Sequence, residues 1–207
     1  MTMTAADVEQ MKHAHAPKGI IPAILHRWSP RSFSDRPVNL DDLRTVFEAA
    51  RWAASSYNEQ PWRFLVGTRG SETYQKIFSS LVEMNQAWAK MAPVLILGAA
   101  KSTFSHNSAP NAVALYDLGA AAATFCYQAT ALGLHTHQMG GFDRDIARKA
   151  FNIPDEFLLG AVIAVGYQGD PSVLTIPFMA EQETSPRTRK QISEFVFSAW
   201  NEPARLA

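Results

Sequence analysis

Two long apolar runs do most to limit the fold of this chain. They span residues 93–99 and 158–166, and neither contains a charged or amide side chain. A strand with one face in water alternates apolar and polar residues, whereas a strand covered on both faces is apolar throughout. We therefore predict that both runs are strands in the interior of a sheet. Pro93 stands at the start of the first run, where its missing N–H does least harm.

The segment 111–132 is the longest helical pattern, and it is apolar on nearly every face. Its run of small residues at 119–123 lets another helix approach closely, and Gly133 is suited to end it. Such a helix needs burial on every face, which two copies of the chain supply more easily than one. Asp117 would cost about 2.5 to 3.5 kcal/mol near a bilayer centre. We therefore predict a buried helix and no membrane span.

The remaining patterns predict one domain over residues 20–207, after an N-terminal extension over residues 1–19. Helices are expected at 20–26, 40–54, 70–88 with an interruption, and 144–151; further strands are expected at 62–67, 135–139 and 192–197. Asn39 and Asp143 are the expected N-caps of two of these helices. Residues 101–110 are predicted to be a loop. Residues 169–189, which contain three prolines, are predicted to be irregular.

The charge balance argues against polyanionic partners. Lys+Arg and Asp+Glu number 19 each, so no net field recruits nucleic acid or an anionic membrane. The N-terminus lacks the basic and apolar regions of a signal peptide. The single cysteine, Cys126, fits a reducing cytoplasm and is expected to be a small buried residue rather than a catalytic thiol. We expect a cytoplasmic protein.

Several common site motifs are missing from the sequence. No Gly-x-Gly-x-x-Gly follows a predicted strand, and no phosphate-binding Walker sequence or Gly-x-Ser-x-Gly elbow occurs. His135 and His137 alternate on a predicted strand, but no cysteine or carboxylate stands at ligand spacing beside them. We predict no metal site.

Four polar residues lie on the connection between the helix at 40–54 and the strand at 62–67: Ser55, Ser56, Asn58 and Gln60. Pro61 disfavours the right-handed helical region for Gln60. The hydroxyls and amides can bind a flat heteroaromatic ligand in several directions. Alternatively, these residues only end the helix and shape a turn.

Two basic groups stand far apart in the sequence. Arg27, Ser29 and Arg31 alternate, so in an extended segment they project from one side and suit a phosphate. Arg187 and Arg189 form a second alternate pair. Both groups together could neutralise one phosphate, or each could be ordinary solvated surface.

A third group, Met139, Gly140 and Gly141, ends the predicted strand at 135–139. Two glycines permit the backbone to approach a planar ligand closely and leave its amides accessible. A simple turn before the helix that Asp143 caps explains the same residues equally well.

These groups, in this order, resemble the FMN-dependent nitroreductase family, and the similarity covers residues 20–197. The resemblance implies an α+β fold with a mostly antiparallel central sheet flanked by helices. It also implies an intertwined homodimer with two FMN sites at the interface.

Carried over by motif position, the resemblance implies that Arg27 and Ser29 bind the FMN phosphate and that Arg187 and Arg189 close over it. Arg31 would lie near the pyrimidine edge of the isoalloxazine, and Trp28 would contribute mainly its backbone. Ser55, Ser56, Asn58 and Gln60 match a flavin-binding segment that comes partly from the partner subunit. Met139, Gly140 and Gly141 match the loop against the isoalloxazine.

Two residues depart from the family pattern. Ala54 replaces a proline of many relatives, and Gly140 replaces a glutamate of some nitroreductases, so any substrate contact made by that glutamate is absent here.

The implied activity is an NADH- or NADPH-dependent FMN oxidoreductase that reduces a small-molecule acceptor, such as a nitroaromatic or quinone, in a ping-pong cycle. The flavin carries the hydride chemistry, with Arg31 stabilising negative charge on it and no side chain needed as general acid. A non-catalytic FMN storage or sensing protein would use the same residues. So would a specialised flavin oxidoreductase of the same fold.

Overall fold

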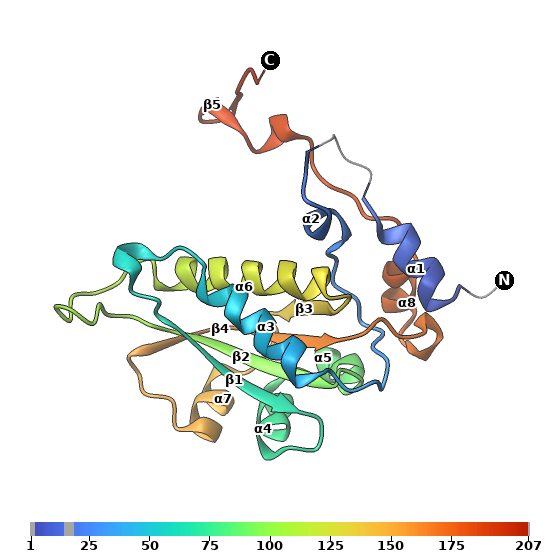
Figure 1. Ribbon diagram of the computed structural model, residues 1–207, viewed down its shortest axis with the longest axis horizontal. Coiled ribbons are helices and arrows are strands. Elements are labelled where there is room, and N and C mark those ends of the chain that lie inside the picture. The colour runs from blue at the N-terminus through green and yellow to red at the C-terminus, as the bar shows by residue number, and fades with distance from the viewer. Residues whose placement is uncertain (1–2, 15–18, 207) are drawn as a thin grey trace.

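An antiparallel sheet forms the centre of the computed structural model, which describes residues 3–14 and 19–206 (Figure 1). Its spatial strand order is β1, β2, β4, β3, with bounds Trp62–Thr68, Val94–Lys101, Phe157–Gly166 and His135–Met139. All three pairings are antiparallel. The predicted α+β fold with an antiparallel sheet is confirmed.

The two apolar runs form the central strands β2 and β4, as predicted. Every β2 residue from Val94 to Ala100 is buried, and so is the second half of β4 from Val162 to Gly166. The first half of β4 is only partly covered, and Leu158 is 39% exposed. The prediction of full coverage therefore holds for β2 and for the second half of β4.

Helices cover both faces of the sheet. The helices α3 (Leu40–Arg51) and α6 (Ala114–Ala131) cover one face, and α4 (Glu72–Ser80), α5 (Glu83–Ala89) and α7 (Arg144–Phe151) cover the other (Figure 1). Asn39 caps α3 by accepting a hydrogen bond from the Asp41 N–H, and Asp143 caps α7 by accepting from the Asp145 and Ile146 N–H groups. Both predicted N-caps are confirmed.

The long helix α6 is buried along one side only. Leu118, Ala121, Phe125 and Ala129 pack inward, but Tyr116 in its first turn is 80% exposed. The chain leaves α6 through Gly133, whose φ of 73° is left-handed and therefore favours glycine. One copy of the chain does not bury this helix on every face.

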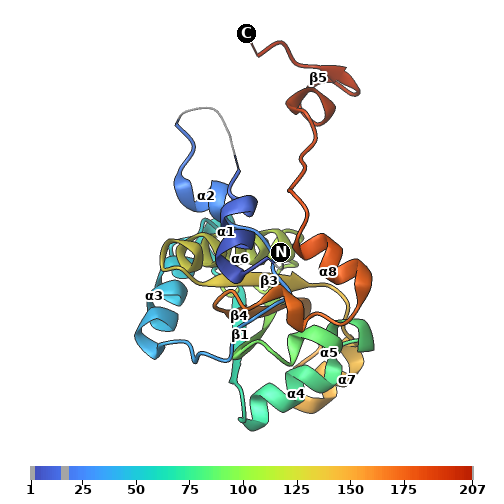
Figure 2. The same ribbon diagram turned by 90° about the vertical axis from the view of Figure 1, so that its right-hand side faces the viewer.

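Three helices gather at one end of the molecule, beside the end of β3 (Figure 2). They are α1 (Ala5–Lys12), α2 (Pro22–His26) and α8 (Pro177–Glu183). Beyond α8 the chain extends away from the body as an arm made of η3 (Ile192–Glu194), β5 (Phe197–Ala199) and β6 (Glu202–Pro203).

Two sequence predictions near the C-terminus are wrong. Residues 169–189 contain the short helices η2 (Pro171–Val173) and α8, because Pro171 and Pro177 each stand in a first helical turn, where proline is tolerated. Residues 192–197 do not form one strand. They begin with η3, and within the part of the chain that the structure describes β5 pairs with β6 of the same arm alone.

The segment before α3 runs alongside the sheet. The Ser34 N–H donates to the Tyr167 carbonyl over 3.0 Å, and His137 Nδ1 lies 2.9 Å from the Pro30 carbonyl oxygen. Because a carbonyl only accepts, Nδ1 carries the proton of this imidazole. Burial lowers the pKa of His137 to about 4, and its ring contacts Trp88 at 4.5 Å between centroids. A neutral histidine thus holds residue 30 against β3.

Among the described residues, no helix combines the length and the apolar character needed to cross a bilayer.

The Phe125→Ala substitution tests the packing of α6 on the sheet. Phe125 is fully buried and contacts Phe47 edge to face at 5.0 Å. Removing the ring should lower the free energy of unfolding by about 3–5 kcal/mol, measured by urea denaturation. The control is Phe178→Ala, because Phe178 is 44% exposed. A loss no larger than that of the control would contradict this packing.

The depressed pKa of His137 predicts a pH-dependent stability. Between about pH 4 and the ordinary histidine pKa of 6.5, the unfolded chain binds a proton at this position that the folded protein excludes. Stability should be complete above pH 6.5 and decline as the pH falls toward 4, by at most about 1.4 kcal/mol per pH unit. The His137→Gln variant keeps a donor for Pro30 but does not titrate, so it should lack this contribution. If the stability–pH curves of the unsubstituted protein and of His137→Gln run parallel, this contribution of His137 is ruled out.

Candidate functional site

The segment 27–31 presents the first predicted group as expected from its alternation. The Arg27 guanidinium donates to the Ser29 hydroxyl over 3.1 Å. Trp28, between them, turns inward and is 5% exposed. Arg27 and Ser29 therefore face away from the core together while the indole anchors the segment.

The structure brings Arg187 to Arg27, 160 residues earlier in the chain. The Arg187 guanidinium donates to the Arg27 carbonyl over 2.6 Å and also to the Leu25 carbonyl. Burial lowers the pKa of Arg187, and the nearby charges of Arg189 and Arg27 lower it further. The two basic groups thus form one cationic cluster, which the sequence alone left open.

Positive charge in this cluster exceeds the negative charge near it. Among the described residues, Arg27, Arg31, Arg187 and Arg189 form no ion pair with a carboxylate. Burial lowers the pKa of Arg31, and the charge of Glu183 opposes that change. An anion would neutralise this excess.

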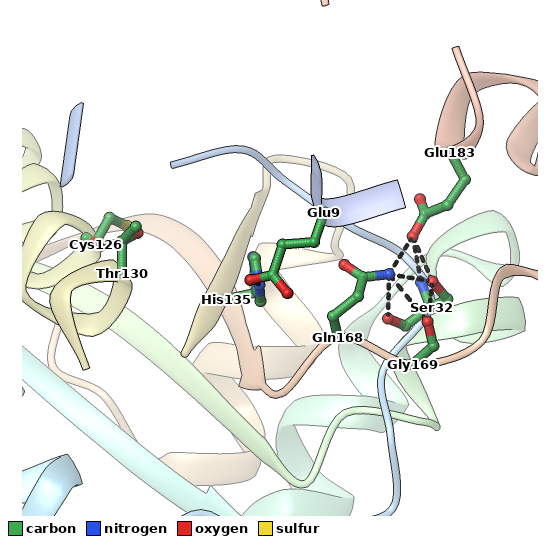
Figure 3. A network of polar contacts seen from close by, with 8 residues as sticks. All are labelled: Glu9, Ser32, Cys126, Thr130, His135, Gln168, Gly169 and Glu183. Carbon is green, nitrogen blue, oxygen red and sulfur yellow. Dashed lines mark hydrogen bonds and ion pairs between the residues drawn. The ribbon is translucent and has the colours of Figure 1, made fainter. Parts of the chain in front are cut away.

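Glu183 is 1% exposed, and its carboxylate contacts Ser32 and Gln168 (Figure 3). Its carboxylate accepts from the N–H groups of Arg31 and Ser32 over 2.9–3.1 Å. It also accepts from the Ser32 hydroxyl over 2.5 Å and from the Gln168 amide over 3.4 Å. These donors compensate a buried carboxylate and lock α8 to the segment that carries the arginines.

The two glycines after β3 have different surroundings. A Cβ on Gly140 would meet no atom within 4 Å, so space is open beside it. A Cβ on Gly141 would lie 2.8 Å from the Asn85 side-chain nitrogen, which donates to the Gly141 carbonyl over 2.8 Å. The side chain of Asn85 therefore crowds Gly141, whereas Gly140 borders open space. Met139 is buried at 3% exposure.

The loop of Met139, Gly140 and Gly141 directly follows β3, and β3 contacts the segment that carries Arg27 and Arg31. His137 contacts Pro30, and the Arg31 charge lowers the pKa of His137. The side chain of Asn85 adds an amide beside this loop that the sequence did not single out. An isolated asparagine in a helical pattern gives no signal that it will meet a glycine 56 residues later.

The segment 55–60 lies elsewhere, at the opposite end of α6 from α1, α2 and α8 (Figure 1). It contains the 3-10 turn η1 (Ser56–Asn58), and the Ser56 N–H donates to the Asp117 carboxylate at the start of α6 over 3.1 Å. One chain therefore does not bring this segment to the cationic cluster.

The backbone of this segment is strained. Tyr57, Asn58 and Gln60 all have φ between 50° and 54°, in the left-handed region that non-glycine residues rarely adopt. Gln60 does leave the right-handed helical region before Pro61, but it is left-handed rather than extended. The Ser55 hydroxyl accepts from the Gln60 N–H over 3.0 Å, so the turn-shaping role holds for Ser55. Clustered strain of this kind is typical of functional sites.

A cavity of about 250 Å³ lies between α6 and β4, lined in part by Leu118, Gly119, Gly160 and Ala161. It reaches Gln138, but none of the predicted site residues lines it.

The described residues support neither a metal site nor a reactive thiol. Within residues 3–14 and 19–206, no three His, Cys, Asp or Glu side chains gather as they would around a metal ion. Cys126 is 2% exposed, and burial raises the pKa of its thiol, so it is a small buried residue as expected.

Comparison with known proteins agrees with this geometry. The nitroreductase family model matches residues 24–167. A solved structure described as an oxidoreductase containing FMN is 36% identical, with a TM-score of 0.84 over 90% of this chain and 95% of that one.

Two relatives are similar in sequence. An uncharacterised protein of Mycolicibacterium smegmatis is 32% identical over 149 residues, which are 68% of this chain and 99% of that protein. A protein of Archaeoglobus fulgidus, provisionally named NADH dehydrogenase/NAD(P)H nitroreductase, is 28% identical over 71% of this chain and 84% of its own length. On the family match and on these relatives, the chain belongs to the nitroreductase family, as its motifs predicted.

Proposed function

We propose that this protein is an FMN-dependent oxidoreductase that takes hydride from NADH or NADPH and reduces a small-molecule acceptor such as a nitroaromatic or a quinone. Family membership, the FMN in the 36% identical structure and the name of the archaeal relative support this proposal. The observation that carries it is the contact of Arg187 with the Arg27 backbone, because it joins two cationic groups whose arginines form no ion pair with a carboxylate among the described residues.

The residues present fit FMN. A phosphate needs several charge-assisted donors, and Arg27, Ser29, Arg187 and Arg189 supply them in one cluster. A planar ring needs backbone without a Cβ in its way, and Gly140 borders such open space. We assign the phosphate to the cluster and the ring to the loop of Met139, Gly140 and Gly141, with Trp28 contributing only its backbone.

When bound, FMN supplies the hydride chemistry of a ping-pong cycle between the nicotinamide and the acceptor. Arg31 stabilises negative charge at the pyrimidine edge. Its backbone is held by Glu183, so this charge needs little reorganisation during the reaction.

We further propose a homodimer in which Ser55, Ser56, Asn58 and Gln60 of the partner subunit complete each site. Two observations support it. The segment 55–60 lies far from the cationic cluster within one chain (Figure 1). Large apolar side chains near it are exposed, with Trp52 at 75%, Tyr57 at 81% and Tyr116 at 80%. The C-terminal arm also carries Trp200 at 88% exposure, which a second copy would cover.

Flavin reduction tests the proposed activity directly. The purified protein is loaded with FMN, freed of excess flavin and mixed anaerobically with NADH or NADPH. We expect the visible absorbance of oxidised flavin to disappear with at least one nucleotide and to return when a nitroaromatic or quinone is added. The control variant Arg44→Ala changes an exposed arginine on α3, outside the cluster and outside the segment 55–60, and should behave like the unsubstituted protein.

No loss of absorbance with either nucleotide would remove the proposed activity. Slow reduction that no acceptor reverses faster than buffer alone would instead favour the storage or sensing role.

A further inference from the structure

The N-terminal helix α1 docks against the end of α8 through a buried lysine. Lys12 is 3% exposed, and its ammonium donates to the carbonyls of Gln182 over 2.7 Å and Ser185 over 2.5 Å. Val8, one turn earlier, is fully buried. Figure 2 shows α1 and α8 at the same end of the molecule. The helix α1 therefore packs against the folded body.

The buried location of Lys12 is unfavourable for a charged ammonium unless nearby contacts compensate the charge. Burial lowers the pKa of Lys12, the charges of Arg187 and Arg31 lower it further, and Glu183 acts in the opposite direction. Carbonyls at the C-terminal end of a helix stabilise a cation. The ammonium also lies 4.6 Å from the centre of the Trp28 ring, a favourable cation–π distance.

These contacts join both halves of the cationic cluster. Trp28 stands between Arg27 and Ser29, and Ser185 stands two residues before Arg187. Glu183, between the two carbonyls that Lys12 binds, holds the backbone of Arg31 and Ser32. A single side chain thus fixes the turn that leads into Arg187 and the indole that anchors Arg27.

We propose that Lys12 is a positioning residue for the phosphate of FMN. It does not touch the ligand, because its ammonium is buried and directed at two carbonyls and an indole. It acts by holding Arg187 and the segment 27–29 in the arrangement that binds phosphate, which lowers the ordering cost of binding. This inference rests on the proposed function.

The test compares two flavins that share one ring system. Riboflavin lacks the phosphate of FMN, so a defect in phosphate positioning should affect FMN alone. Dissociation constants are measured by fluorescence titration of flavin-free protein, full-length and either unsubstituted or carrying Lys12→Met. We expect Lys12→Met to weaken FMN binding about tenfold and to change riboflavin binding by less than about twofold. The control Lys149→Met makes the same change at an exposed lysine on α7 and should alter neither.

Three results would overturn the inference. Unchanged FMN affinity in Lys12→Met would show that the arginines do not depend on this lysine. Equal weakening of both flavins would show that Lys12 only supports the fold, and a thermal melt of the same sample would record that loss. If the unsubstituted protein binds neither flavin, the proposed function itself is wrong and the inference falls with it.

Discussion

The cationic cluster depends on the hydrogen bonds from the Arg187 guanidinium to the carbonyls of Arg27 and Leu25. They draw together basic segments from the two ends of the chain, against the repulsion between like charges. The fold supports this arrangement on both sides, with Glu183 holding the backbone at Arg31 and Lys12 holding the end of α8. Preorganised positive charge that forms no ion pair with a carboxylate among the described residues favours an anion, and the anion that we propose is the phosphate of FMN.

The sequence predicted the sheet because the constraint there is simple. A strand covered on both faces must be apolar throughout, and residues 93–99 and 158–166 meet that condition. The start of helix α7 was equally predictable, because the Asp143 side chain can cap it. The helix α8 is hard to predict because it is short and lies among prolines, a composition typical of a loop. Its only signal is that Pro177 is suited to a first helical turn. The apolar pattern of residues 192–197 predicts a strand, but a pattern does not show which strand would pair with it, and among the described residues β5 pairs within the arm alone.

The site was only partly readable, because its parts meet through tertiary contacts. Alternation predicted that Arg27 and Ser29 lie together, but nothing local shows that Arg187 reaches them. Two adjacent glycines look alike in sequence, yet Asn85 crowds Gly141 while Gly140 borders open space. Lys12 and Glu183 gave no signal because each binds groups more than 150 residues away.

The central claim is that each flavin site combines the cationic cluster of one subunit with the segment 55–60 of the other. Co-expressing an Arg187→Ala chain with an Asn58→Asp chain tests it most directly, since every mixed dimer would then hold one intact site and one doubly altered site. The account predicts weak FMN binding by each variant alone, and wild-type affinity at about a quarter of all sites after random pairing. If co-expression restores no tight binding, the two groups do not come from different subunits and the account is contradicted.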